Sequence, residues 1–194
     1  MSTVSIIGSG GMAAAIGGRI AKAGHTVEVV SRDPAKARAL ADKLAAGAAT
    51  YGAAPAGDIV VLAVPYGSAA AVVADYGDAL DGKVIIDITN PVAADLSGLV
   101  TPHGSSGAQE IAKGAPAGAH VVEAFNTIFG HVLAKGGRLD ALIAADDPEA
   151  KARVSTFIES LGLRPLDVGG LHMASTLEAL GLMMIGLAVH KASD

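Results

Sequence analysis

The chain has 194 residues, which suits one α/β domain or one domain with a small appendage. Its formal net charge of −5 makes nucleic acid and anionic membrane surfaces poor candidates for partners, because both attract basic proteins. The chain contains no cysteine, which excludes disulfides, thiolate catalysis and cysteine-based metal sites and is compatible with the cytoplasm.

The first predicted element is a short buried strand that ends at Ile7 and runs into a glycine-rich turn. Gly8, Gly10 and Ala13 fit the G-x-G-x-x-G/A pattern of a strand–turn–helix unit that binds a dinucleotide. Gly8 permits the tight turn, Gly10 leaves room for a pyrophosphate, and Ala13 lets the helix pack close to the strand. The N–H groups that begin this helix then face the phosphates. The pattern predicts a dinucleotide site, with a plain structural turn as the alternative.

A second strand is predicted over 26–30, and the residues after it indicate which dinucleotide binds. An NAD site places an acidic side chain here for the ribose hydroxyls, whereas an NADP site supplies cations and hydroxyls for a 2′-phosphate. Ser31, Arg32 and Lys36 are donors of the second kind. We therefore predict NADP(H) as the cofactor, with a solvated basic surface as the alternative for Arg32 and Lys36.

One acidic residue, Asp33, competes with this interpretation because it lies where an NAD site would place its acid. Pro34 follows it directly, and proline is favoured at the first position of a helix. We therefore interpret Asp33 as the N-cap of a helix over 34–46.

The rest of the chain continues the alternation of strands and helices that is typical of a parallel, doubly wound sheet. Strands are predicted at 58–65, 83–88, 120–125, 139–144 and 164–168, with a connection at 51–55 that has room for a short strand. Helices are predicted at 68–80, near 107–113, from 148 to about 161, and at 173–190. We expect an α/β fold of Rossmann type, with a mostly parallel sheet in a domain over 1–171 and a C-terminal helical appendage over 172–194.

Open α/β sheets bind ligands at the carboxyl ends of their strands, which directs attention to three short segments. These segments are Ala63-Val64-Pro65, Asn90-Pro91 and Asn126-Thr127. The two prolines turn the backbone over the cofactor, or act only as strand stops. Asn126 and Thr127 either hold the nicotinamide amide or satisfy loop carbonyls.

Catalytic and metal-binding side chains form no recognisable pattern in the sequence. His103, His120, His131, His172 and Lys113 lie in no arrangement typical of a proton donor, and the histidines lack the spacing of a metal site. We therefore predict no catalytic acid or base and no metal. Transfer of hydride from one cofactor to another needs neither, because the reactive atoms belong to the cofactors.

The chain begins directly with a strand, so we expect no signal peptide. The apolar run at 177–189 is interrupted by Glu178 and by small residues, and we interpret it as too short to span a bilayer. The sequence therefore predicts a soluble cytoplasmic protein that acts on a small-molecule redox substrate without a membrane partner.

With these motifs in place, the chain resembles the coenzyme F420-dependent NADP oxidoreductases over nearly its whole length. The matching segments are Gly8-Ser9-Gly10-Gly11-Met12, Ser31-Arg32 with Lys36, Leu62-Ala63-Val64-Pro65, Ala124-Phe125-Asn126-Thr127-Ile128 and the segment 162–169. The resemblance implies a Rossmann-fold enzyme that passes hydride between NADP(H) and a deazaflavin. Relatives with the same fold include the cytoplasmic domains of metalloreductases, which use a flavin.

The resemblance also implies roles for individual residues. Ser9 to Met12 would cradle the pyrophosphate, and the three polar residues after the second strand would hold the 2′-phosphate. Ile128 and Gly130 would lie where the deazaflavin stacks on the nicotinamide. Family members form homodimers through their C-terminal helices, so we expect a homodimer here. The chain stops at Asp194, earlier than expected of the family, whose closing segment helps to form the deazaflavin pocket.

Three functions are compatible with these observations. The first is hydride transfer between NADP(H) and coenzyme F420 or a flavin. The second is NADPH-dependent reduction of a small carbonyl or imine, which would need a proton donor. The third is a non-catalytic NADPH-binding redox sensor, which would show no turnover.

Overall fold

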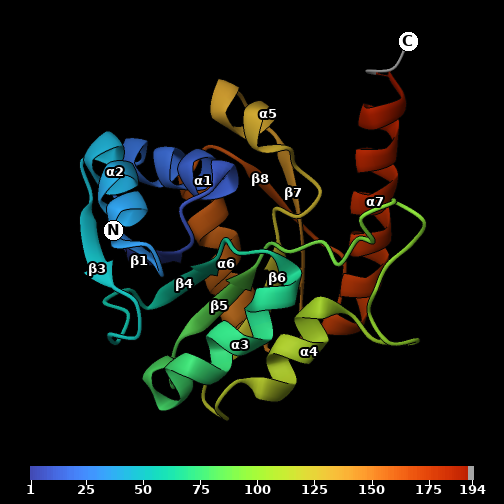
Figure 1. Cartoon of the computed structure of the whole chain (residues 1–194), viewed down its shortest axis with the longest axis horizontal. Helices are drawn as coiled ribbons and strands as arrows, with labels where there is room; N and C mark the ends of the chain where they lie inside the picture. Colours follow the sequence, from blue (N-terminus) through green and yellow to red (C-terminus); the bar gives the residue numbers. More distant parts are fainter. Residues whose placement is uncertain (192–194) are drawn as a thin grey trace.

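Eight strands form one sheet in the order β3-β2-β1-β4-β5-β6-β7-β8, with helices on both of its faces (Figure 1). The computed structural model describes residues 1–191. The strands are β1 (Thr3–Ile7), β2 (Thr26–Ser31), β3 (Gly47–Thr50), β4 (Ile59–Leu62), β5 (Val84–Asp87), β6 (His120–Ala124), β7 (Asp140–Ala145) and β8 (Arg164–Asp167). The helices are α1 (Gly11–Lys22), α2 (Pro34–Leu44), α3 (Tyr66–Tyr76), α4 (Gly107–Gly114), α5 (Gly130–Lys135), α6 (Pro148–Ser160) and α7 (Ala174–Lys191), with 3₁₀ turns η1 (Gly77–Leu80) and η2 (Leu171–Met173).

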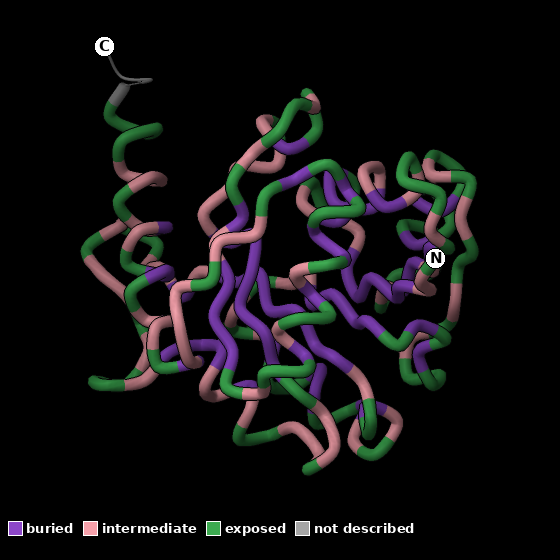
Figure 2. Tube along the Cα trace, turned by 180° about the vertical axis from the view of Figure 1, so that it is seen from behind, coloured by how far each residue is buried: buried purple, intermediate pink, exposed green. Residues whose placement is uncertain are grey.

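The core lies on the two faces of the central strands, which Figure 2 shows as mostly buried. β4 and β5 are buried along their whole length, as parallel strands covered on both faces must be. One apolar cluster joins the sheet to α1, α2 and α6, and a second joins its other face to α3 and α4. Strand order reverses between β1 and β4, so the turn after β1 opens at the position where doubly wound sheets bind ligands. The predicted α/β fold with a mostly parallel sheet is confirmed.

Three local predictions differ from the structure. The strand expected within 51–55 lies earlier, at β3, where it pairs in parallel with β2. β7 pairs antiparallel to β6, so the chain returns across the sheet without the crossover that a parallel strand requires. The helix predicted over 68–80 begins at Tyr66 and ends at Tyr76, where a 3₁₀ turn replaces it.

α7 contacts the body of the protein through its first half, and its later turns stand away from the sheet (Figures 1 and 2). Its first turns contact α4 and η2, whereas Met183 and Leu187 are 54% and 60% exposed. Among the described residues, the segment Leu171–His190 is long and apolar enough to cross a membrane by length and composition. The sequence-based statement that this run is too short is therefore wrong. A core helix of a soluble protein passes the same test, so the segment alone assigns no membrane.

Candidate functional site

The glycine-rich turn leads from β1 into α1 and leaves the beginning of this helix open. Gly8 has a φ of +135°, and a Cβ atom there would lie 2.0 Å from the carbonyl oxygen of Ala63, so only glycine is accommodated. A Cβ atom at Gly10 or Gly11 would meet nothing within 4 Å. The first turn of α1 has neither a side-chain cap nor an acidic residue. Its N–H groups and its positive dipole end therefore suit a phosphate, which is the fit expected of a dinucleotide.

A first hollow, of about 250 Å³, lies between the ends of β1, β2 and β4, and we call it the β2-side hollow. Its lining includes the predicted residues Gly8, Ser9, Gly10, Ser31, Arg32, Ala63, Val64 and Pro65, together with Ile7, Tyr51 and Val72. The hydroxyls of Ser9 and Ser31 are 3.2 Å apart and join the glycine-rich turn to the end of β2. The fold thus brings Ser9 and Gly10 of the turn together with Ser31 and Arg32 in one hollow.

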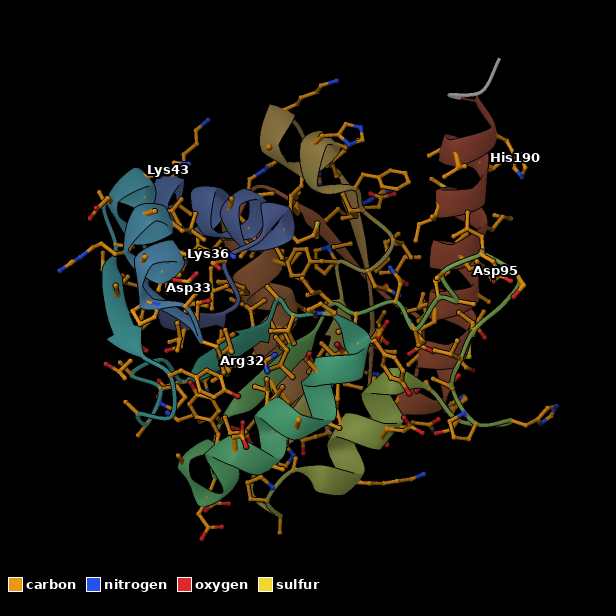
Figure 3. The ribbon with its side chains drawn as sticks, viewed as in Figure 1. Arg32, Asp33, Lys36, Lys43, Asp95 and His190 are labelled. Carbon is orange, nitrogen blue, oxygen red and sulfur yellow. The ribbon has the colours of Figure 1, made fainter. Side chains whose placement is uncertain are left out.

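The acidic residue that competed with an NADP interpretation is the cap of α2. Asp33 accepts hydrogen bonds from the backbone N–H groups of Ala35 and Lys36, at 3.0 and 3.2 Å, as its position before Pro34 predicts. Lys36 is 72% exposed, lies 3.7 Å from the Asp33 carboxylate and is absent from the lining of the hollow. Figure 3 shows Arg32 on the side of α3, away from Asp33 and Lys36. Arg32 is therefore the principal cation of this site.

A second hollow, of about 170 Å³, lies at the ends of β5 and β6, and we call it the β6-side hollow. Its lining includes the predicted residues Met12, Asn90, Asn126, Thr127, Ile128 and Gly130, together with Ile88, Phe125, Phe129, Gly181, Met184 and Ile185. Most of these side chains are apolar, which suits a flat, largely apolar ring. Phe125 is fully buried with a φ of +63°, a costly backbone conformation that turns the chain from β6 into this wall.

Two asparagines hold the polar side of the β6-side hollow. The Asn90 side-chain N–H₂ donates to the carbonyl oxygen of Asn126 at 2.7 Å, and the Asn126 amide donates back to the Asn90 side-chain oxygen at 3.3 Å. The Asn126 side-chain oxygen is buried and has no hydrogen-bond partner among residues 1–191. Pro91 lies outside both hollow linings, and its carbonyl oxygen accepts from the Val100 N–H at 2.7 Å. Asn90 thus satisfies the backbone carbonyl of Asn126, and the Asn126 side chain retains one free acceptor.

The two hollows lie on either side of the beginning of α1, with Gly10 in the lining of one and Met12 in the lining of the other. A Cβ atom at Gly130 would lie 3.1 Å from the sulfur of Met12 and 3.6 Å from the carbonyl oxygen of Gly11. The start of α5 therefore packs directly against the glycine-rich turn. An elongated ligand that lies over Gly10 and Gly11 would reach both hollows.

Buried carboxyls lie beneath the β6-side hollow. Asp87 and Glu123 are opposite each other in the register of β5 and β6, and both are fully buried. Burial raises the pKa of Asp87 to about 6, partly offset by hydrogen bonds from Thr89. Burial, and then the neighbouring Asp87 carboxylate, raise the pKa of Glu123 well above its usual range. A hydrogen bond between the two carboxyl groups acts in the same direction, because it favours the protonated form of Glu123 and the ionised form of Asp87.

The candidate acids and bases are dispersed. The ring of His131 stacks on that of Phe129, with centroids 5.6 Å apart, which places it behind one wall of the β6-side hollow. His25 accepts from the Ser2 N–H and contacts Ser160, as expected of a structural residue. Within the described part of the chain, no group of three or more histidine, aspartate or glutamate side chains could hold a metal.

A third hollow, of about 540 Å³, lies toward the opposite end of α1. Arg19 lines it, and its guanidinium donates to the carbonyl oxygens of Leu133, Leu161 and Gly137. This arginine ties α1 to α5 and to the end of α6. Because its donors are used by the backbone, we interpret the hollow as a packing feature.

Comparison with known proteins agrees with this geometry. The sequence profile described as "NADP oxidoreductase coenzyme F420-dependent" matches residues 3–91. The F420-dependent NADP reductase of Methanothermobacter marburgensis is 30% identical over 94% of this chain and 90% of its own length. The chain belongs to the family of coenzyme F420-dependent NADP oxidoreductases.

Other members and relatives of the family extend this result. A structure of a proposed F420-dependent NADP-reductase from Arthrobacter sp. FB24 superposes with a TM-score of 0.87 at 25% identity, over 99% of this chain and 96% of that one. The rat metalloreductase STEAP3 is 32% identical over 94% of this chain, which spans only 37% of that protein's length. As a family member, the chain is an NADP-dependent oxidoreductase.

Some site residues could not be identified from the sequence. Tyr51 enters the β2-side hollow because β3 ends just before it. Gly181, Met184 and Ile185 enter the β6-side hollow because α7 folds back against α4. No local motif marks these residues, because long-range packing brings them to the site.

Proposed function

We propose that this protein transfers hydride between NADP(H) and a deazaflavin such as coenzyme F420, or a flavin, that binds in the β6-side hollow. The observation that carries the proposal is the pair of hollows on either side of the uncapped start of α1. One hollow offers Arg32 and Ser31 to a 2′-phosphate, and the other offers an apolar wall to a ring system. NADPH, when bound, supplies the hydride.

The residues of the chain would bind and orient rather than exchange protons. Gly8, Ser9, Gly10, Gly11 and Met12 would hold the pyrophosphate over the start of α1. Ser31 and Arg32 would hold the 2′-phosphate, with Lys36 as a more distant, exposed charge.

The walls of the β6-side hollow would orient the two rings. Asn126 and Thr127, with Asn90 behind them, would hold the nicotinamide side, and Ala63, Val64, Pro65 and Pro91 would close the strand ends over the cofactor. Ile128 and Gly130 would lie against the acceptor ring. Apolar surroundings exclude water from the transferred hydride.

Titration with NADPH and NADH, followed by oxidised F420 and then FMN, tests the proposal. NADPH-selective binding with reduction of F420 or FMN is the expected result. Tight NADPH binding without turnover of either acceptor would instead favour a redox sensor.

Reduction of a small carbonyl or imine is the second enzymatic possibility, and His131 stacks on Phe129, which lines the β6-side hollow. If that reaction were the physiological one, His131→Ala or His103→Ala would lower the rate by about 100-fold or more, according to which histidine donates the proton. For hydride transfer between two cofactors we expect less than about a tenfold effect from either variant, because no catalytic proton donor is required.

We also propose a cytoplasmic homodimer, formed through the apolar exposed face of α7 that includes Met183 and Leu187. The division into an NADP-binding domain over 1–171 and an appendage over 172–194 belongs to the same proposal, with residues 192–194 outside the described part of the chain. Sedimentation of the wild-type protein and of Leu187→Glu tests it, since the variant should dissociate into monomers.

A further inference from the structure

The helix α7 forms one wall of the β6-side hollow. Gly181, Met184 and Ile185 line the hollow from this helix. Gly181 lies directly against Asn90, because a Cβ atom there would be 2.2 Å from the Asn90 side-chain oxygen. The position of α7 therefore fixes Asn90 and, through its hydrogen bond, the segment that begins at Asn126.

One side chain anchors α7 at this position. Glu178 lies three residues before Gly181, one turn away on the helix, and is fully buried. One of its carboxyl oxygens accepts a hydrogen bond of 2.7 Å from the N–H of Gly107, the first residue of α4. The other carboxyl oxygen is buried without a hydrogen-bond partner in the described chain. The anchor thus joins two helices through a single buried carboxyl.

The charged groups that act on this carboxyl are acids on β5 and α4. Asp87 of β5 and Glu110 of α4 act directly on Glu178, which in turn acts on Glu123 of β6 and Tyr66 of α3. The Tyr66 hydroxyl donates a hydrogen bond of 2.6 Å to the Glu110 carboxylate and so joins α3 to α4. Burial, followed by the negative charges of Asp87 and Glu110, raises the pKa of Glu178 to about 7, despite the N–H donors of α4.

We propose that Glu178 is a positioning residue, whose buried carboxyl anchors α7 on α4 through the Gly107 N–H and so sets the α7 wall of the β6-side hollow. The functional part of this inference rests on the proposed binding of the second substrate in that hollow. Its structural part, the docking of α7, is independent of any activity.

The sign of the pH dependence follows from linkage. A carboxyl with a raised pKa in the docked state binds more protons there than when α7 is released, so docking weakens as the pH rises. The loss begins above pH 4.5, the pKa of the released carboxyl, and levels off above about 7. With these two values, the opening equilibrium of α7 increases by about tenfold between pH 6 and pH 8.

Hydrogen exchange of the α7 amides and of the Gly107 amide, corrected for the intrinsic rate at each pH, measures this opening without any substrate. For the wild-type protein we expect the tenfold rise between pH 6 and 8. Glu178→Gln keeps an acceptor for the Gly107 N–H and removes the charge. The opening equilibrium of α7 in this variant should therefore rise by less than about threefold between pH 6 and 8, and this smaller rise would come from Glu123. Adding Glu123→Gln should abolish that smaller rise. Glu159→Gln, at an exposed position on α6, is the matched control and should behave as the wild type.

The kinetic readout separates positioning from general stability. Between pH 6 and 8, KM for the acceptor should rise more for the wild type than for Glu178→Gln, whose rise stays below about threefold, while the Kd for NADPH changes little in either protein. Glu178→Ala should raise KM at every pH, because Gly107 then loses its acceptor. If neither F420 nor FMN is turned over, the proposed function fails but hydrogen exchange still decides the role of Glu178. An equal rise of α7 exchange in wild type and Glu178→Gln would overturn the inference.

Discussion

Replacing Arg32 by alanine tests the cofactor assignment most directly. Arg32 lines the β2-side hollow and takes part in no ion pair found among residues 1–191, so its guanidinium is available to a ligand. A hydrogen bond to a charged group contributes about 1.5–3 kcal/mol. Because Arg32 is exposed, we expect a loss of about 2 kcal/mol for NADPH, which is about a 30-fold increase in Kd. NADH lacks the 2′-phosphate, and its Kd should barely change.

The assay is a titration followed by the fluorescence of the reduced nicotinamide, with both cofactors and at two salt concentrations. Lys36→Ala is the matched control. Lys36 is 72% exposed and lies near Asp33, so its removal should raise the Kd for NADPH by less than about threefold. An equal loss of affinity for NADPH and NADH in Arg32→Ala would refute the assignment of the 2′-phosphate to this hollow.

Three further variants test other parts of the site. Gly8→Ala should lower Tm by about 6 °C or more, because its Cβ atom would collide with a backbone oxygen. Gly10→Ala should leave Tm nearly unchanged but weaken NADPH binding by about tenfold or more. A normal Tm for the first variant, or normal binding by the second, would contradict this account of the turn. Gly130→Ala should raise KM for the acceptor severalfold without unfolding the protein, because the flexible Met12 side chain can move away from the added methyl group. An unchanged KM would show that Gly130 does not contact the acceptor. Glu123→Gln should raise Tm by about 2–4 °C or more at pH 8 and by less at pH 5. The reason is that a buried carboxyl with a raised pKa lowers the stability of the folded protein only as the pH rises above 4.5. Equal changes in Tm at both pH values would show that Glu123 does not titrate in this way.

The sequence predicted those parts of the fold that depend on local patterns. The strand–turn–helix unit around Gly8 and the Asp33 cap are decided by neighbouring residues, and the structure has both. β3, with the sequence Gly-Ala-Ala-Thr, has too little apolar character to predict a strand, and it forms because β2 offers a free edge. The antiparallel direction of β7 is likewise invisible in its sequence, since the same apolar residues would suit either direction.

The residues of the candidate site also fall into two groups, those that the local sequence predicts and those that only long-range packing places. Segments at the ends of β1, β2, β4 and β6 were predicted because each is adjacent to its own strand. Tyr51 and Gly181 were not, because their places depend on contacts between segments far apart in the chain. The sequence leaves Asn126 open between a ligand contact and a loop contact. Its side-chain amide donates to the Asn90 side chain and its side-chain oxygen has no partner among residues 1–191, so a ligand contact remains a prediction.

The contact between Gly130 and Met12 has a thermodynamic consequence. Met12 lies in the first turn of the helix that would receive the phosphates, and it also lines the hollow proposed for the acceptor. A first ligand that restrains Met12 reduces the conformational entropy that remains to be lost when the second one binds. The two ligands should therefore bind cooperatively, and the factor by which one tightens the other must be the same in either order.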